Sequence, residues 1–348
     1  MSSPRPKPHI SQTWSQTDLN VLSTQRSGLF GLSILWLMLF HSTLTPAWAP
    51  LYGLKTMGRV GADMFLLLSG MGLYYSMEGD PSPRRFWRKR AARVLLPYLV
   101  AAGVYELSRC LLGHQGWGEA LQNLTFVSLF REGELDNWFV AFLLPCYLAY
   151  PLLYRAVKSQ RRWLWALLLP GGSLGVTYLV FLLDPFLFFR IYGLLLRVPV
   201  FLVGCFLAPL VKEGRPLRTL PTLLICALGA GVSLAVWLVT DPWYLRLLPQ
   251  IPLSFFLALG AGVLLSWLPK GNWLRRLLGA LGGMTLEIYL VHERLLGFLG
   301  GVMFPTLGPL VLNLLAGLLA VALAWGLKKL CDGMGKRLSK GGSSYERK

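Results

Sequence analysis

Long runs of apolar residues, separated by short polar segments, follow one another along the whole chain. Each run is about 20 residues long, the length that an α-helix needs to cross a bilayer. The runs lack the alternating polar pattern of outer-membrane strands. The sequence therefore predicts an all-α, polytopic membrane helix bundle with about ten transmembrane helices. The predicted spans are 28–46, 60–77, 94–113, 138–154, 163–183, 191–211, 219–240, 249–268, 277–292 and 302–327.

The composition agrees with this class, because 54% of the residues are hydrophobic, only 14% are charged and the mean hydropathy is +0.53. The cysteines are scattered in or beside the predicted spans without CxxC spacing, so we expect neither a metal site nor a disulfide framework. The phosphate-binding loop, HExxH and GxSxG motifs of soluble enzymes are missing as well. We therefore expect no tightly bound cofactor.

Positive charge is distributed unevenly along the chain. A net charge of +18 would suggest nucleic acid as a partner for a soluble protein. Here the basic residues cluster in every second gap between predicted spans, which indicates a positive-inside topology and no nucleic-acid partner. We expect a multi-pass protein of the bacterial cytoplasmic membrane with both termini cytoplasmic. The predicted units are an N-terminal arm (1–27), a membrane domain (28–327) and a basic, disordered tail (328–348), and no removable signal peptide is expected.

His41 ends the uncharged run GLFGLSILWLMLF. An ionisable side chain in a bilayer span needs partners or water, so it marks a candidate functional site. The alternative is a histidine that reaches the membrane interface without a chemical role.

Further ionisable residues fall inside the predicted spans. Asp63, Arg197 and Glu287 are expected to line a cavity or to take part in catalysis, because an unpaired charge would be costly there. Glu287 and His292 are five residues apart and differ by about 140° around a helix, so they need not share a face.

Two pairs of charged residues have helical spacing. Glu106 and Arg109 are three residues apart and are expected to form a self-neutralising structural pair. Arg90 and Arg93 have the same spacing on a predicted helix that enters the third span, where two guanidinium groups would suit phosphate. The alternative for this second pair is a positive-inside anchor.

A histidine with a nearby carboxylate suits a general base in acyl transfer or a relay in proton-coupled transport. The residues alone leave both readings open. A transporter or flippase for an anionic or glycosylated lipid would use the same buried charges as a pathway, although no convincing internal repeat relates 28–160 to 163–327.

Six blocks of the sequence, in order, resemble the integral-membrane acyltransferase 3 family, whose members include bacterial polysaccharide and lipopolysaccharide O-acetyltransferases. The resemblance covers about residues 24–327. The blocks are GLSILWLMLFHS with His41, VGADMFLLLSG with Asp63, FWRKRAARVLLPYL with Arg90 and Arg93, DNWFVAFLLPCYLAYPLLY with Trp138, RVPVFLVGCFLAPLVKEGR with Arg197, and MTLEIYLVHE with Glu287 and His292.

The resemblance implies an enzyme that moves an acyl group, usually acetyl, from cytoplasmic acyl-CoA to a hydroxyl of a glycan or glycolipid outside the membrane. Arg90 and Arg93 would then hold the CoA phosphates. His41 would deprotonate the acceptor hydroxyl or carry the acyl group transiently. Asp63 or Glu287 would orient His41.

The resemblance further implies substrate-binding or oxyanion-stabilising roles for Arg197, Trp138 and His292. The expected partners are acyl-CoA, membrane lipid and the glycan or glycolipid acceptor.

One position departs from the family pattern. The family usually has arginine or lysine eleven residues before the histidine, where this chain has Phe30. Arg26 lies about one helical turn further back and takes this place only if the helix extends that far. Phe30 therefore also keeps open a third reading, a non-catalytic relative of the acyltransferases.

Overall fold

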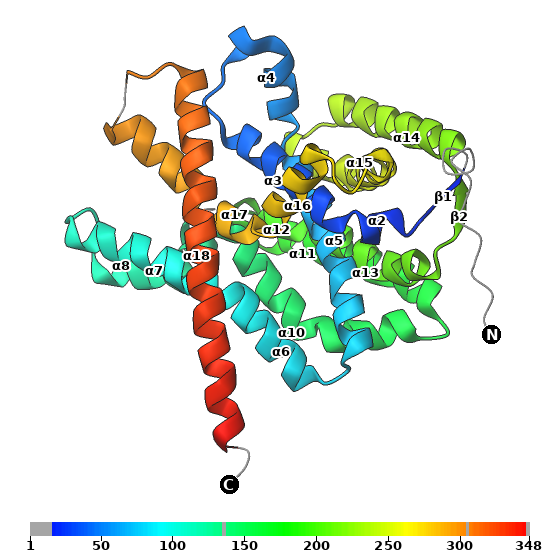
Figure 1. Ribbon diagram of the computed structural model, residues 1–348, viewed down its shortest axis with the longest axis horizontal. Coiled ribbons are helices and arrows are strands. Elements are labelled where there is room, and N and C mark those ends of the chain that lie inside the picture. Colours follow the sequence, from blue (N-terminus) through cyan, green and yellow to red (C-terminus); the bar gives the residue numbers. More distant parts are fainter. Residues whose placement is uncertain (1–15, 134–136, 304–305, 346–348) are drawn as a thin grey trace.

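The computed structural model describes residues 16–133, 137–303 and 306–345, which are mostly helical (Figure 1). The first helices are α2 (Val21–Thr24), α3 (Arg26–His41), α4 (Ala49–Thr56), α5 (Arg59–Gly79), α6 (Pro83–Arg90), α7 (Leu96–Leu111), α8 (Trp117–Leu124), α9 (Val127–Glu132) and α10 (Trp138–Lys158). The later helices are α11 (Arg162–Leu183), α12 (Pro185–Leu195), α13 (Val198–Glu213), α14 (Thr219–Val239), α15 (Leu247–Trp267), α16 (Trp273–Gly282), α17 (Thr285–Phe298) and α18 (Pro309–Tyr345).

Short irregular elements join these helices. Two 3-10 turns lie at Pro46–Trp48 and Trp243–Arg246, and two π-helical turns lie at Ala91–Leu95 and Leu299–Met303. The strands β1 (Gln16–Asp18) and β2 (Pro216–Arg218) form a small antiparallel pair, with Thr17 opposite Leu217.

Seven helices of the described part are long and apolar enough to cross a membrane, which confirms a polytopic helical membrane protein. They overlap seven of the ten predicted spans. The predicted span 28–46 corresponds to the shorter helix α3, and the span 60–77 corresponds to α5. The span 277–292 is divided between two helices, since α16 ends at Gly282 and α17 begins at Thr285. The seven candidates are Pro83–Leu111, Trp138–Lys158, Arg162–Leu183, Pro185–Glu213, Thr219–Val239, Trp243–Trp267 and Pro309–Gly335.

Glycines let the central helices approach each other closely. Gly204 of α13 lies against the backbone carbonyl of Leu67 on α5, where a Cβ atom would collide with it. Gly31 of α3 meets α16 at the carbonyl of Leu278 in the same way. Small residues at such crossings are typical of membrane helix pairs, which associate by close packing. These contacts fix α3 and α5, the helices that carry His41 and Asp63.

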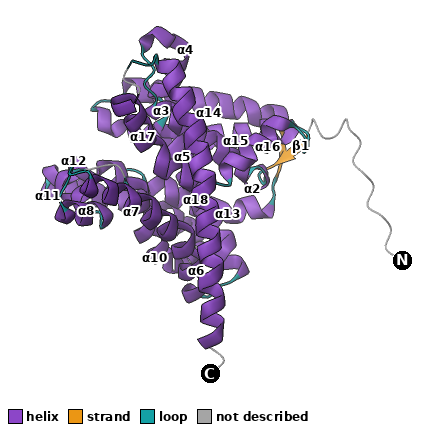
Figure 2. Ribbon diagram, turned by 60° about the vertical axis from the view of Figure 1, so that its left-hand side comes forward, coloured by secondary structure: helices purple, strands orange, loops and turns teal. Residues whose placement is uncertain are grey.

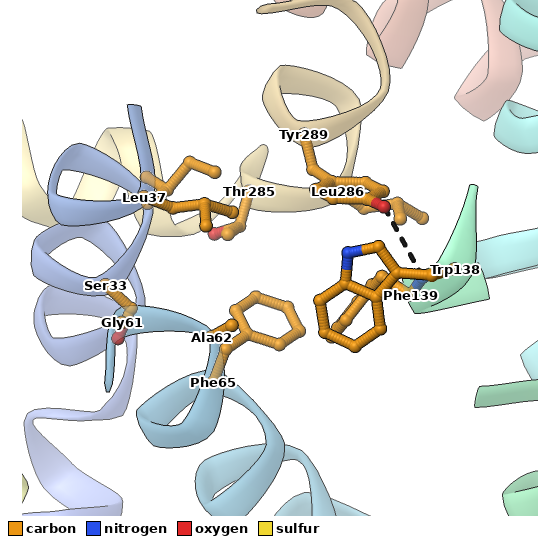
Figure 3. Close-up of a pocket in the computed structure, with 11 residues that line it drawn as sticks. Ser33, Leu37, Gly61, Ala62, Phe65, Trp138, Phe139, Thr285, Leu286 and Tyr289 are labelled. Atoms are coloured by element: carbon orange, nitrogen blue, oxygen red, sulfur yellow. Dashed lines mark hydrogen bonds between the residues drawn. The ribbon is translucent and has the colours of Figure 1, made fainter. Parts of the chain in front are cut away.

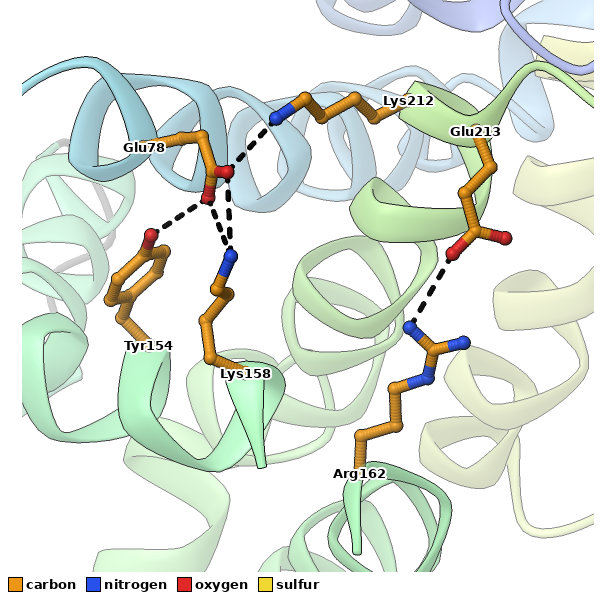
Figure 4. A network of polar contacts seen from close by, with 6 residues as sticks. All are labelled: Glu78, Tyr154, Lys158, Arg162, Lys212 and Glu213. Atoms are coloured by element: carbon orange, nitrogen blue, oxygen red, sulfur yellow. Dashed lines mark hydrogen bonds and ion pairs between the residues drawn. The ribbon is translucent and has the colours of Figure 1, made fainter. Parts of the chain in front are cut away.

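The ends of α5, α10 and α13, each next to a basic loop, meet at one end of the bundle, called here the basic end. Glu78 of α5 accepts hydrogen bonds from Lys212 Nζ (2.9 Å), Tyr154 Oη (2.8 Å) and Lys158 Nζ (3.2 Å), as Figure 4 shows. These donors, that of Lys212 first, lower the pKa of the Glu78 carboxyl to about 2. The network joins α5, α10 and α13 and neutralises part of the basic charge.

The opposite, distal end contains the end of α3 and the start of α18. Asn313 Nδ2 donates to Thr43 Oγ1 (2.9 Å), and the Thr43 backbone N–H donates to Asn313 Oδ1 (3.1 Å). The end of α3 and the start of α18 therefore lie close together.

Both terminal segments differ from the sequence expectation where they are described. The described part of the arm (16–27) contains β1, α2 and the first two residues of α3, which begins at Arg26 rather than at 28. Helix α18 continues to Tyr345, so most of the segment expected to be a disordered tail has helical backbone (Figure 2). A pair between Lys328 and Asp332 (3.7 Å), one turn apart, supports the helix beyond the predicted end of the span.

We expect Gly204→Leu to destabilise the protein, because the new side chain would push α5 and α13 apart. Overpacking of this kind costs about 1–3 kcal/mol or more. Thermal unfolding of the purified protein in detergent measures the effect. Gly175→Leu on α11 is the matched control, since a Cβ there meets open space and its melting temperature should stay near that of the wild type. Equal melting temperatures for both variants would contradict the packing role.

Candidate active site

His41 is the last residue of α3 and lies at the distal end beside Glu293 of α17. Its Nδ1 atom is 3.1 Å from Glu293 Oε1, and its side chain is 20% exposed. Helix α3 ends here because Ser42 adopts an extended conformation. The sequence reasoning missed Glu293, which directly follows His292 just beyond a predicted span. An adjoining carboxylate fixes the tautomer and orientation of an imidazole, leaving Nε2 for chemistry.

His292 lies next to this pair. Its ring centroid is 5.2 Å from that of His41, and its side chain is buried. Its Nδ1 atom is 3.1 Å from the carbonyl oxygen of Ile288 and 3.0 Å from that of Tyr289. His292 and Glu287 do occupy different faces of α17, since Glu287 points to another partner, described below.

Asp63 forms a buried ion pair with Arg197. Arg197 Nε donates to Asp63 Oδ1 (2.9 Å), and the guanidinium lies over the Trp138 ring at 4.8 Å. With its amide oriented to satisfy both neighbours, Gln250 donates to Asp63 Oδ2 (2.9 Å) and accepts from Trp237 Nε1 (3.1 Å). Asp63 therefore pairs with Arg197 and Gln250. It does not contact His41, so the expectation that Asp63 orients His41 is wrong.

Glu287 is fully buried and pairs with Arg93, not with His41. Arg93 Nη1 donates to Glu287 Oε1 (2.8 Å), and Arg93 Nη2 donates to the Gly283 carbonyl (3.2 Å). Arg93 lies in the π-helical turn that follows α6. Arg93 is therefore already paired with a carboxylate, while the binding of phosphate by Arg90 and Arg93 together stays a prediction.

Arg26 lies beside Arg90 at the basic end, close enough for mutual repulsion. Within the described segments, neither guanidinium has a carboxylate partner, and the Nε atom of each is buried without a hydrogen bond. Arg26 stacks on Phe30 (5.0 Å to the ring centroid) and packs against Gly72, where any side chain would displace it. Because α3 begins at Arg26, the condition for Arg26 to take the place of the usual basic residue is met.

A narrow pocket lies between α3, α5, α10 and α17 (Figure 3). Ser33 and Leu37 border it on α3, between Arg26 and His41 in the sequence. On the other side the backbone N–H of Phe139 donates to Tyr289 Oη (3.4 Å), which closes this wall. The pocket therefore lies between the two groups of ionisable residues. Its lining residues are Ser33, Ile34, Leu37, Gly61, Ala62, Phe65, Trp138, Phe139, Thr285, Leu286 and Tyr289.

Glu106 and Arg109 do not pair as expected. Glu106 Oε2 accepts from Gln115 Nε2 (2.6 Å) and Asn123 Nδ2 (3.1 Å), while Arg109 approaches Glu119 (3.8 Å). The segment after α7 folds back as α8, which brings amide donors to Glu106 that helical spacing could not reveal.

These features define a polytopic helical membrane protein with ionisable groups at both ends of a narrow pocket. The model of the acyltransferase 3 family, described as an acyltransferase domain, matches residues 29–329. The chain therefore belongs to this family, as the six blocks indicated.

A curated relative, acyltransferase MdmB of Streptomyces mycarofaciens, is 30% identical over 126 residues. This match covers 32% of the chain and spans about a third (33%) of the relative's length. No solved structure matches the chain.

We expect Asp63→Asn to destabilise the protein by about 3–5 kcal/mol, because it leaves the buried Arg197 guanidinium uncompensated. Thermal unfolding in detergent measures the loss, and the double variant Asp63→Asn/Arg197→Gln should recover part of it. Asp332→Asn is the matched control, since its exposed pair with Lys328 is worth less than about 1 kcal/mol. A loss of similar size for Asp63→Asn and Asp332→Asn would contradict the role of the buried pair.

Proposed function

We propose that this protein is an O-acyltransferase of the bacterial cytoplasmic membrane, organised as a bundle of ten spans. It transfers an acyl group, acetyl in the family's usual reaction, from cytoplasmic acyl-CoA to a hydroxyl of an extracytoplasmic glycan or glycolipid. The observation that carries the proposal is the pair of His41 and Glu293 at the distal end, in a chain of this family.

His41 acts as the general base in this proposal. With Nδ1–H donated to Glu293, the Nε2 lone pair of His41 takes the proton of the acceptor hydroxyl. The acceptor oxygen then forms a bond with the thioester carbonyl carbon, and the bond to the CoA sulfur breaks. The thiolate receives the proton back from the imidazolium, so the products are the O-acyl ester and CoA thiol. Glu293 stabilises the transient imidazolium.

Arg26 and Arg90 hold the donor phosphates. Among the described residues, these two partly buried guanidinium groups have no carboxylate partner, and the Nε atom of each is buried without a hydrogen bond, which is costly in a membrane protein. A bound phosphate would compensate both charges. Arg93 instead keeps the Glu287 carboxylate paired. The proposed donor site therefore consists of Arg90 together with Arg26 of α3, in place of the expected pair of Arg90 and Arg93.

The distance between the two groups suits an extended donor. Arg26 and His41 are the first and last residues of α3 and lie about 22 Å apart along the helix axis. The narrow pocket between α3, α5, α10 and α17 lies along this path, and in this proposal it widens when the pantetheine arm enters. The buried Asp63–Arg197 pair keeps α5 and the following helices in register beside this path.

We expect His41→Ala to lower acyl transfer by about 100-fold or more, and Glu293→Gln to lower it by about tenfold, because the base is removed or loses its orienting charge. The measurement uses the purified protein with radiolabelled acetyl-CoA and the envelope glycans and glycolipids of cells that lack the gene. Label in the acceptor fraction is counted over time.

His114→Ala is the matched control, since His114 is exposed after the end of α7. It should transfer label at nearly the wild-type rate. Undiminished transfer by a folded His41→Ala protein would refute the mechanism, as would an equal loss in His114→Ala.

A further inference from the structure

Three side chains with metal-binding atoms meet at the distal end. One ligand atom each of His41, His292 and Glu293 lies within 4.8 Å of the others. The first residue comes from α3 and the other two from α17, so the cluster joins segments about 250 residues apart in sequence. The spacing of cysteines, on which the expectation of no metal site rested, could not reveal such a cluster.

His292 has a free and buried ring nitrogen. A backbone carbonyl only accepts hydrogen bonds, so the Nδ1 atom near the Ile288 and Tyr289 carbonyls must carry the proton. The Nε2 atom then has a lone pair, and it is buried without a hydrogen-bond partner among the described residues, in a side chain that is 4% exposed. Histidine ligands of metal ions usually donate their other N–H to a backbone carbonyl or carboxylate in this way.

We propose that His41, His292 and Glu293 bind a divalent transition-metal ion of the zinc type. Two imidazole nitrogens and one carboxylate oxygen are the donor set that such ions prefer. With bonds of about 2.0–2.2 Å, ligands of one ion lie at most about 4.2 Å apart, so the cluster needs a contraction of several tenths of an ångström. Glu293 is half exposed and provides this movement, and water fills the fourth position.

The bound ion inhibits acyl transfer, because it occupies a nitrogen of His41 and the Glu293 carboxylate. This consequence rests on the proposed function, whereas the binding itself does not. Zinc inhibition of this kind would link the activity to the metal content of the space outside the membrane.

Cobalt binding to the purified full-length protein tests the site. The protein is prepared with a tag that contains no histidine, and Co²⁺ is titrated while visible absorption is recorded. We expect one bound Co²⁺ per chain, displaced by Zn²⁺. His292→Ala and Glu293→Gln should each weaken binding by about tenfold or more, since each removes a ligand. His114→Ala should bind as the wild type does.

Thermal unfolding with and without Zn²⁺ separates loss of the site from loss of the fold. Zn²⁺ should raise the melting temperature of the wild type and of His114→Ala, but not that of His292→Ala. Absence of Co²⁺ binding by the wild type, or wild-type binding by folded His292→Ala, overturns the metal site. If binding holds while His41→Ala still transfers label, the proposed function fails and the metal site stands.

Discussion

A charge inside a membrane helix must be compensated, and this constraint organises the whole structure. Asp63 is neutralised by Arg197, and Glu287 by Arg93, each across helices far apart in sequence. Both carboxylates are almost fully buried, so their ion pairs determine which helix faces can meet. The glycine contact between α5 and α13 then allows the close approach that the Asp63–Arg197 pair requires.

The groups that remain outside these pairs are the ones available for function. At the basic end, the guanidinium groups of Arg26 and Arg90 lack a carboxylate partner among the residues described. At the distal end, His41 lies beside the half-exposed carboxylate of Glu293 and near His292, whose Nε2 atom has no hydrogen-bond partner within the described part of the chain. A narrow pocket lies between the two ends. This separation supports the proposal that donor and acceptor approach from opposite sides and meet near His41.

Hydrophobic patterning predicted the helical class and most of the spans, because each apolar run is a local property of the chain. The position of His41 near the outer end of its span could likewise be predicted from one segment, although α3 ends at His41 and not at residue 46. The carboxylate partner of His41 could not be predicted, because Glu293, Asp63 and Glu287 all lie within a predicted span or near its end. Only the packing of α3 against α17 distinguishes them. The 3.6-residue pattern also did not predict the π-helical turn at Arg93 or the start of α3 at Arg26.

The most direct test of the donor arrangement is the affinity of CoA for the purified protein, measured by isothermal titration calorimetry. Arg26→Gln should weaken CoA binding by about tenfold or more, the effect of losing one charged hydrogen bond to phosphate. Arg88→Gln removes the same charge from an exposed position on α6, and it should leave the affinity almost unchanged. Equal affinities for both variants would contradict a donor site built on Arg26 and Arg90.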